Sequence, residues 1–304
     1  MSRTLAGQLQ YAVLQSNRIG TSKYADRKAG TSKYHAHSHS TIKKRLEVAK
    51  SLGKYIQREF GVRQATDIQK EHIQSYLDAC ASSGRYTPKA LESTTSEARA
   101  VCRAASEAFR HFTYEGEGLK SPTPASYIPS DRDPEGMLQA DYNMIRDNTP
   151  NRNLQYGLDI ARMTGARAYG CVNLRGTDIQ EKDGNMTVTL KEKGGASRKV
   201  DVVREEYKQV LRNYARYFGD TKLCTIKEKS LIKNLNRAME KYPMLKEYRY
   251  AKMHAVRKLW ANERYREYRQ NHTKLETVQY MNQQLGHSAE RDEALLARYV
   301  ADIF

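Results

Sequence analysis

The sequence predicts a mainly α-helical protein that carries one small β-sheet or hairpin insert. Apolar residues recur at three- and four-residue steps along most of the 304 residues, which is the spacing of a helix that buries one face. Strict alternation of apolar and polar residues is confined to residues 186–203, and two glycines interrupt it. Apolar residues make up 39% of the chain, so packed cores are expected, and the length suggests roughly two domains.

Residues 1–40 are predicted to be a basic, mostly flexible arm. The five-residue repeat GTSKY occurs twice in this segment, and no helical period is sustained. The alternating His35, His37 and His39 would suit a metal ion, but no fourth ligand is in view, so we favour a solvated polar tail and predict no metal site. The basic residues of the arm are expected to contact phosphates without regard to sequence.

Residues 41–115 are predicted to form a small, all-helical domain. The first amphipathic pattern begins at Ile42 and ends at Gly61, a second begins at Thr66, and a third spans residues 91–114. Glycine and proline separate the second pattern from the third, which is typical of a turn between two helices.

Residues 137–304 are predicted to form the second domain, after a Pro/Gly-rich linker at 116–136 that holds four of the seven prolines. Within this domain, Met186, Val188 and Leu190 alternate with polar residues before a Gly-Gly turn, which predicts a β-hairpin. Helical periods flank the hairpin on both sides, and we expect helices over 138–148, 154–164, 205–217, 228–241, 252–270, 274–285 and 290–301.

The charge of the chain points to a polyanionic partner. Its 52 Lys and Arg outnumber 35 Asp and Glu, which gives +17 and favours nucleic acid over a merely basic surface. No apolar run approaches the ~20 residues that a membrane span needs, so no membrane association is expected. The four cysteines lack a CxxC pair, and neither a disulfide framework nor a zinc module is predicted. We therefore expect a cytoplasmic protein associated with nucleoid DNA.

Several segments of the second domain carry residues suited to phosphate chemistry. They are Thr164-Gly-Ala-Arg167 with Leu174 and Asp178-Ile179 after it, Lys193 in the hairpin turn, His254-Ala-Val-Arg257, and Leu285-Gly-His287 with Tyr299 twelve residues later. Attack on a phosphodiester builds negative charge on the phosphate oxygens, and without a metal motif that charge must meet fixed cations. Guanidinium groups are permanently charged and grip two oxygens at once, which favours Arg167 and Arg257. His254 and Arg257 are three residues apart and so share one helix face.

In this order, the motifs resemble those of the tyrosine recombinase (phage integrase) family, over about residues 137–304. The preceding helical domain resembles the family's SAM-like core-binding domain. The resemblance implies that this domain and an α+β catalytic domain form a clamp on DNA, and that no cofactor is used. It also implies a catalytic set in which Tyr299 is the nucleophile, His254 the base, Lys193 the acid that protonates the leaving 5′ oxygen, and Arg167, Arg257 and His287 the phosphate ligands.

Alternatives and departures remain for some of these residues. Lys191 and Lys199 lie on the same hairpin as Lys193 and compete for the role of acid. The family usually has an acidic residue three positions after the first arginine, where this chain has Gly170, and another carboxylate is expected to compensate or the chemistry to slow. The spacing from Arg257 to His287 and from His287 to Tyr299 is longer than usual, and only five residues follow Tyr299, which suggests a divergent branch. The single Trp260 is expected to pack beneath the site.

The sequence thus predicts a site-specific DNA recombinase that works through a 3′-phosphotyrosine intermediate to integrate or excise a mobile element. The expected partners are specific double-stranded DNA sites, three further copies in a homo-tetramer on two duplexes joined as a Holliday junction, and an accessory DNA-bending protein. The alternatives are a type IB topoisomerase and a DNA-binding regulator or architectural protein on a decayed recombinase fold. Further DNA contacts are expected from Lys43, Lys44, Arg45, Arg99, Arg103, Arg110 and Arg198, although a solvated helix face explains the helical ones equally well.

Overall fold

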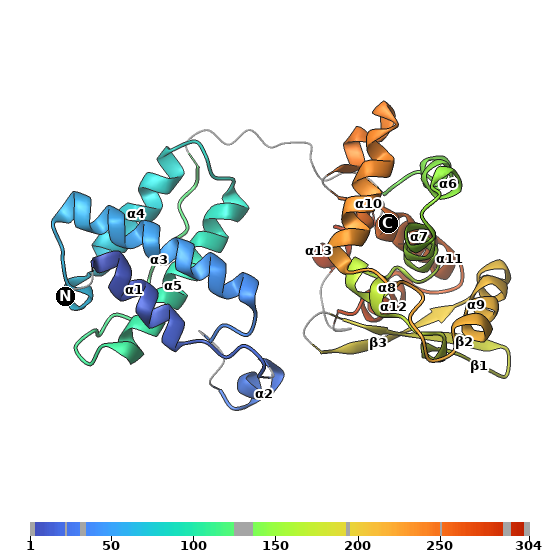
Figure 1. Cartoon of the computed structure of the whole chain (residues 1–304), viewed down its shortest axis with the longest axis horizontal. Coiled ribbons are helices and arrows are strands. Elements are labelled where there is room, and N and C mark those ends of the chain that lie inside the picture. Colours follow the sequence, from blue (N-terminus) through green and yellow to red (C-terminus); the bar gives the residue numbers. More distant parts are fainter. Residues whose placement is uncertain are drawn as a thin grey trace. The chain divides into compact units, whose positions relative to one another are not determined.

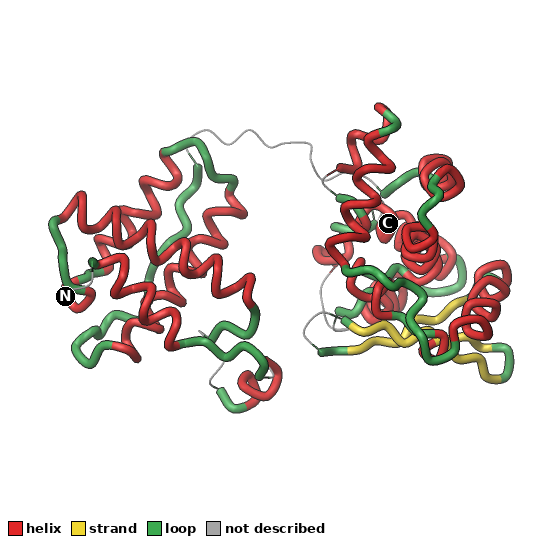
Figure 2. Tube along the Cα trace, viewed as in Figure 1, coloured by secondary structure: helices red, strands yellow, loops and turns green. Residues whose placement is uncertain are grey.

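The computed structural model describes residues 4–21, 23–30, 35–124, 136–192, 195–249, 251–287 and 293–300 (Figure 2). The chain divides into two compact units, residues 1–129 and 130–304, and each is described by itself. The boundary between the units lies within the segment expected to be a linker. The start of that segment belongs to the first unit, because Leu119 is buried in its core and Gly116 packs against Arg99.

The first unit is built from helices (Figure 1). Its long helix α3 begins after Ser38, whose hydroxyl accepts a hydrogen bond from the Thr41 amide, and ends at Gly61 in the left-handed conformation. Proline occupies the first turn of α5, where its missing amide hydrogen costs nothing. The helices are α1 (Leu5–Gln15), α2 (Lys23–Lys28), α3 (His39–Phe60), α4 (Lys70–Ser82) and α5 (Pro88–Ala108), with a 3-10 turn at Ala65–Asp67.

The prediction of a flexible arm over residues 1–40 is wrong for helix α1. Leu5, Leu9 and Val13 of this helix are buried in the same core as α3 and α5. The packing against α3 is close, because a Cβ atom at Gly53 would lie 2.6 Å from the Cα of Ala6. The chain then returns toward α1, and Asn17 pairs with Ala36. The apolar residues of α1 recur at i and i+4, so the helix hides one face in the unit and is part of its fold.

Two histidines of the predicted arm, His35 and His37, are partly covered, whereas His39 is exposed. His37 Nε2 lies 3.4 Å from Asp26 Oδ2, and His35 Nδ1 lies 3.9 Å from the same oxygen. Burial, together with the charge of Arg18, lowers the pKa of His35. Among the residues that the structure describes, these side chains and their neighbours form no cluster that fits a metal ion.

The second unit combines helices with a three-stranded antiparallel sheet of order β1-β2-β3. The mainly α fold with a small sheet is confirmed, and β1 adds a strand to the hairpin that was expected. The elements are α6 (Gln139–Asn148), α7 (Arg152–Thr164), α8 (Ala168–Asn173), β1 (Ile179–Lys182), β2 (Asn185–Lys191), β3 (Ser197–Val202), α9 (Glu205–Phe218), α10 (Glu228–Glu240), α11 (Met253–Arg269), α12 (Lys274–Gln284) and α13 (Glu293–Leu296), with 3-10 turns at Gly176–Asp178 and Pro243–Arg249. Within the described residues, no helix is long and apolar enough to cross a membrane.

The sheet buries one face against the helices. Val188 of β2 pairs with Val200 of β3, and every second residue along both strands is buried. Figure 1 shows the strands along one side of the unit, with α8 and α12 beside them. Helices α7 and α11 pack together in the core, where Trp260 is buried as expected. The α7–α11 pair and the sheet therefore form the support for the residues discussed next.

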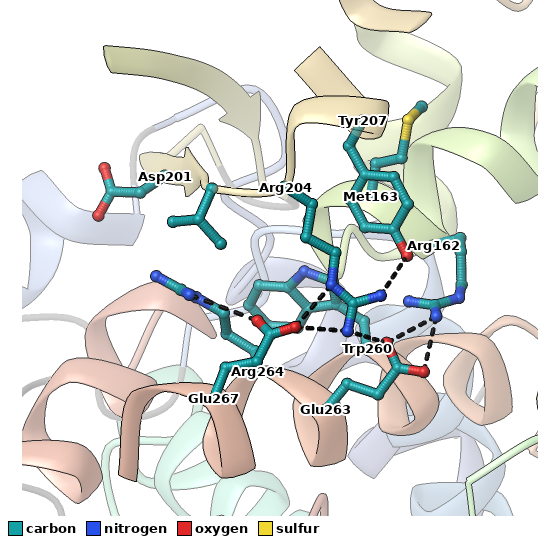
Figure 3. A pocket seen from close by; sticks show the side chains of 10 residues that line it. Arg162, Met163, Asp201, Arg204, Tyr207, Trp260, Glu263, Arg264 and Glu267 are labelled. Carbon is teal, nitrogen blue, oxygen red and sulfur yellow. Dashed lines mark hydrogen bonds and ion pairs between the residues drawn. The ribbon is translucent and has the colours of Figure 1, made fainter. Parts of the chain in front are cut away.

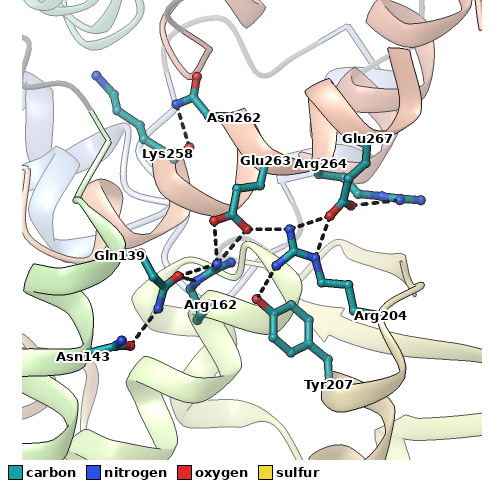
Figure 4. Close-up of polar contacts among 10 residues, drawn as sticks. All are labelled: Gln139, Asn143, Arg162, Arg204, Tyr207, Lys258, Asn262, Glu263, Arg264 and Glu267. Carbon is teal, nitrogen blue, oxygen red and sulfur yellow. Dashed lines mark hydrogen bonds and ion pairs between the residues drawn. The ribbon is translucent and has the colours of Figure 1, made fainter. Parts of the chain in front are cut away.

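A network of ion pairs ties α11 to α7 and to the turn after β3 (Figure 4). Both oxygens of Glu263 accept hydrogen bonds from Arg162, at 2.7 and 2.6 Å, and Arg204 lies 2.8 Å from the same carboxylate. Arg204 also donates to Glu267 at 2.6 Å. Figure 3 shows these side chains beside the indole of Trp260. Arg162 is buried, so its charge requires a partner close by. The Glu263 carboxylate that it shares with Arg204 thereby holds α11 against α7 and the turn after β3.

Candidate active site

The carbonyl group of Gly165 lies at the centre of the candidate site. Helix α7 ends at this glycine, whose φ of +60° is left-handed, and the ring of Trp260 occupies the space of a side chain there. The Gly165 oxygen accepts hydrogen bonds from Arg257 Nη1 and, at 3.0 Å, from Arg198 Nη2. Arg257 Nη2 also donates to the Leu285 oxygen at 2.6 Å. The α7, β3, α11 and α12 ends are thereby held at one point.

Arg257 is fully buried and only partly satisfied by the protein. Its Nε makes no hydrogen bond to any residue that the structure describes. Burial and the charges of Arg198 and Arg167 lower the pKa of the Arg257 guanidinium to about 9, so it is still protonated at neutral pH. A buried cation beside two others is unfavourable in the free protein. An anion bound here would relieve that cost.

One carboxylate, that of Glu192, joins two of the arginines. Its Oε2 lies 2.8 Å from Arg167 Nη1, and its Oε1 accepts from Arg198 Nε at 2.7 Å. Burial alone would raise the pKa of Glu192, but the hydrogen bond from Arg198 and the charges of Arg167 and Arg198 outweigh it and lower the pKa. There is room for a side chain at position 170, because a Cβ there would meet its nearest atoms at 3.6 Å. The carboxylate that pairs with Arg167 is instead that of Glu192, from the hairpin.

Tyr299 lies next to the buried arginine. Its ring centroid is 5.2 Å from Arg257 Cζ and 5.8 Å from the ring centroid of His287. The Asn262 side chain on α11 donates to the Tyr299 carbonyl at 3.1 Å, and the neighbouring Val300 is buried. The structure thus brings together three of the residues that the sequence motifs selected.

His254 stands at the start of α11, one turn before Arg257. Its side chain is exposed, yet desolvation and then the charges of Arg257, Arg167 and Lys258 lower its pKa below 6.5. The imidazole is therefore neutral at pH 7 and able to accept a proton. The remaining candidate, Lys193, lies outside the described residues, whereas its competitors Lys191 and Lys199 are exposed on β2 and β3.

Two of the predicted DNA contacts are wrong. Arg198 is buried and donates hydrogen bonds to Glu192, Gly165 and Gln284 inside the unit. Arg45 is buried and pairs with Glu97 at 3.0 Å. Their charge suggested exposed side chains, but each forms an ion pair with a carboxylate, which offsets the cost of burying the charge.

The other predicted DNA contacts differ in exposure. Lys44 donates to Ser93, and Arg99 donates to the Leu119 carbonyl, so both already have partners inside the first unit. Lys43 and Arg110 are exposed, and Arg103 is half-buried. Contacts between these residues and DNA remain a proposal.

Sequence reasoning missed Glu192. A weak signal was present, because Glu192 directly follows a strand in which Val188 and Leu190 are buried. The glycine at position 170 predicted that another carboxylate would compensate, but not which one.

No protein-family profile matches the sequence, and no curated protein matches it in sequence. Solved structures are similar in fold. The XerH site-specific recombinase bound to palindromic difH substrate, in a post-cleavage complex, is 15% identical, covers 97% of this chain and 90% of its own, and has a TM-score of 0.59. A λ integrase dimer bound to a COC′ core site is 15% identical, covers 98% and 77%, and has a TM-score of 0.54. The Tn1549 transposon integrase (residues 82–397) with circular intermediate DNA is 13% identical, covers 99% and 96%, and has a TM-score of 0.55. Over nearly its full length, this chain has the fold of the tyrosine recombinases.

Proposed function

We propose that this protein is a site-specific DNA recombinase of the integrase type, which cuts and rejoins DNA through a 3′-phosphotyrosine bond. The observation that carries the proposal is the placement of Tyr299 against the buried, incompletely satisfied Arg257, with His287 near the Tyr299 ring. A cationic site next to a tyrosine is suited to attack on a phosphodiester. The fold supports the same class of activity.

In the proposed reaction, the Tyr299 oxygen attacks phosphorus and passes its proton to His254. The bond from phosphorus to the 5′ oxygen breaks, and Lys193 gives that oxygen a proton. Arg167, Arg257 and His287 hold the non-bridging oxygens as charge builds on them. A different 5′ hydroxyl then attacks the phosphotyrosine and releases Tyr299, so strands are exchanged without an external energy source and without a cofactor.

The proposed partners are specific double-stranded sites and further copies of the chain. One solved λ integrase structure of this fold (TM-score 0.52) is a tetramer bound to a Holliday junction, and we propose a homo-tetramer on two duplexes here. The Tn1549 integrase is a transposon protein, which supports a role in moving a mobile element. An accessory DNA-bending protein and residence on nucleoid DNA belong to the same proposal.

Capture of a covalent adduct tests the proposed function. The protein is incubated with fragmented DNA from its source and denatured in detergent, and the DNA that stays attached is sequenced, with Tyr299→Phe in parallel. We expect adducts from the wild type alone, concentrated at one sequence and linked through a 3′ phosphate.

Other results would contradict parts of this proposal. Adducts scattered without sequence preference would favour a type IB topoisomerase. Adducts that persist in Tyr299→Phe would show that another residue is the nucleophile. Tight DNA binding with no adduct would favour a DNA-binding regulator on a decayed recombinase fold.

A further inference from the structure

Glu192 connects elements that must act together at the candidate site. Its two carboxylate oxygens bind different arginines, Arg167 at the start of α8 and Arg198 on β3. Arg198 in turn donates to the Gly165 carbonyl, to which Arg257 also donates. The carboxylate therefore sits in a chain of contacts that fixes the position of one guanidinium relative to another.

The backbone of Glu192 also shapes the hairpin turn. Its amide donates to the Ala196 carbonyl at 2.7 Å, and its own carbonyl accepts from the Gly195 amide at 3.3 Å. These bonds close the turn between β2 and β3, in which Lys193 directly follows Glu192 in the sequence. The residue that holds Arg167 through its side chain thus anchors both ends of the turn through its backbone.

The charge of the cluster depends on this residue. Arg167, Arg198 and Arg257 contribute three positive charges, and Glu192 contributes one negative charge through direct ion pairs. Because Arg198 is buried and its nitrogens are used within the protein, Glu192 balances a cation that is not available to a ligand. Three positive charges and one negative charge leave the cluster with a net charge of +2, which favours an anionic substrate.

We infer that Glu192 is a positioning residue of the active site, which fixes the Arg167 guanidinium against the buried Arg198 and Gly165 and does not itself contact DNA. This inference rests on the proposed recombinase function. Among the described residues, Arg167 forms an ion pair with Glu192 through one nitrogen, and its other donors can face a phosphate. A guanidinium held in this way loses little orientational freedom when the transition state forms.

The first measurement compares DNA binding with cleavage, using the full chain and DNA recovered by adduct capture. Glu192→Gln removes the charge at nearly constant shape, Glu192→Asp keeps the charge on a shorter side chain, and Glu181→Gln is the control. Glu181 belongs to the same sheet but pairs with Arg212, at 2.7 Å. In Glu192→Gln we expect the single-turnover cleavage rate at saturating DNA to fall about 100-fold, while DNA affinity changes by less than about threefold. Glu192→Asp should cleave faster than Glu192→Gln, and Glu181→Gln should match the wild type.

The second measurement does not need activity. In protein labelled with 15N-arginine, the Nε–H signal of Arg198 reports its hydrogen bond to Glu192, which is 2.7 Å long. We expect this signal to move and exchange faster with water in Glu192→Gln but not in Glu181→Gln. If the wild type forms no adduct with any DNA, the recombinase proposal fails, whereas the signal still tests the contact.

Three results would overturn the inference. One is a Glu192→Gln variant that cleaves within about twofold of the wild-type rate. Another is a loss of activity that arises wholly from weaker DNA binding. The third is an Arg198 signal that is unchanged by the substitution.

Discussion

At the residue scale, Gly165 determines both where α7 ends and where two arginine side chains bind. Its left-handed φ ends α7, and its carbonyl is the common acceptor for two arginines. Glycine is required twice over, because a Cβ would be strained at this φ and would lie 2.3 Å from the Trp260 ring. A single residue therefore sets both the end of a helix and the position of the buried guanidinium.

We expect Gly165→Ala to lower the free energy of unfolding by about 2 to 4 kcal/mol, because strain at φ adds to overpacking against Trp260. Gly61→Ala is the matched control. Gly61 also ends a helix with a left-handed φ of +69°, but a Cβ there would meet nothing within 4 Å. It should cost only about 1 kcal/mol. Urea unfolding of both variants measures the difference, and equal losses would contradict the role of Trp260.

His254 predicts the pH dependence of DNA cleavage. The pKa of this histidine is lowered below 6.5 by desolvation and by three cations, so the neutral form that accepts the tyrosine proton persists as pH falls past 6.5. As pH falls, the cleavage rate should therefore decline with a midpoint below pH 6.5, where the imidazole gains a proton. Single-turnover rates on both sides of this midpoint, with His254→Asn as control, measure the effect. A midpoint above pH 6.5 would exclude His254 as the base.

Among the elements, α1 shows the largest difference between expectation and structure. The helical period of α1 covers only eleven residues, and a lysine- and serine-rich repeat follows it. The composition of that repeat therefore favoured a flexible arm over a helix. Only the tertiary contact with α3 makes the helix favourable, because an isolated helix of this length is marginal in water. The longer pattern predicted α3 closely, whereas the pattern over 91–114 begins three residues late for α5 (Pro88–Ala108) and runs six residues past its end.

Truncating the core face of α1 should destabilise the first unit. Leu9 is buried between α1 and its partners, so we expect Leu9→Ala to lower the free energy of unfolding by about 2 to 5 kcal/mol. Leu14→Ala, which changes an exposed residue of the same helix, is the control and should cost less than about 0.5 kcal/mol. Circular dichroism during urea unfolding measures both. If Leu9→Ala lowers the free energy of unfolding no more than the control does, the segment behaves as the flexible arm that the sequence predicted and not as a packed helix.

At the scale of the whole molecule, chemistry was easier to predict than packing. Arg257 was favoured because a phosphate site needs guanidinium groups, and Tyr299 was selected by the resemblance to the recombinase motifs; the structure places the two side by side. Arg198 and Arg45 were misassigned because charge suggests the surface, and only the fold reveals the carboxylate that lets each be buried. A sequence shows which groups are available, whereas their pairing depends on contacts between distant segments.

Those distant contacts also govern when the site comes into existence during folding. The Gly165 carbonyl meets donors that lie 33 and 92 residues further along the chain, and Arg198 reaches a carbonyl 86 residues away. Closing such long loops is slow and is rewarded only once several segments have docked. A partly folded chain therefore has scattered arginines but no assembled anion site. The anion site that the proposed DNA cleavage requires is complete only once these distant segments have docked, so a folding intermediate lacks the means for that reaction.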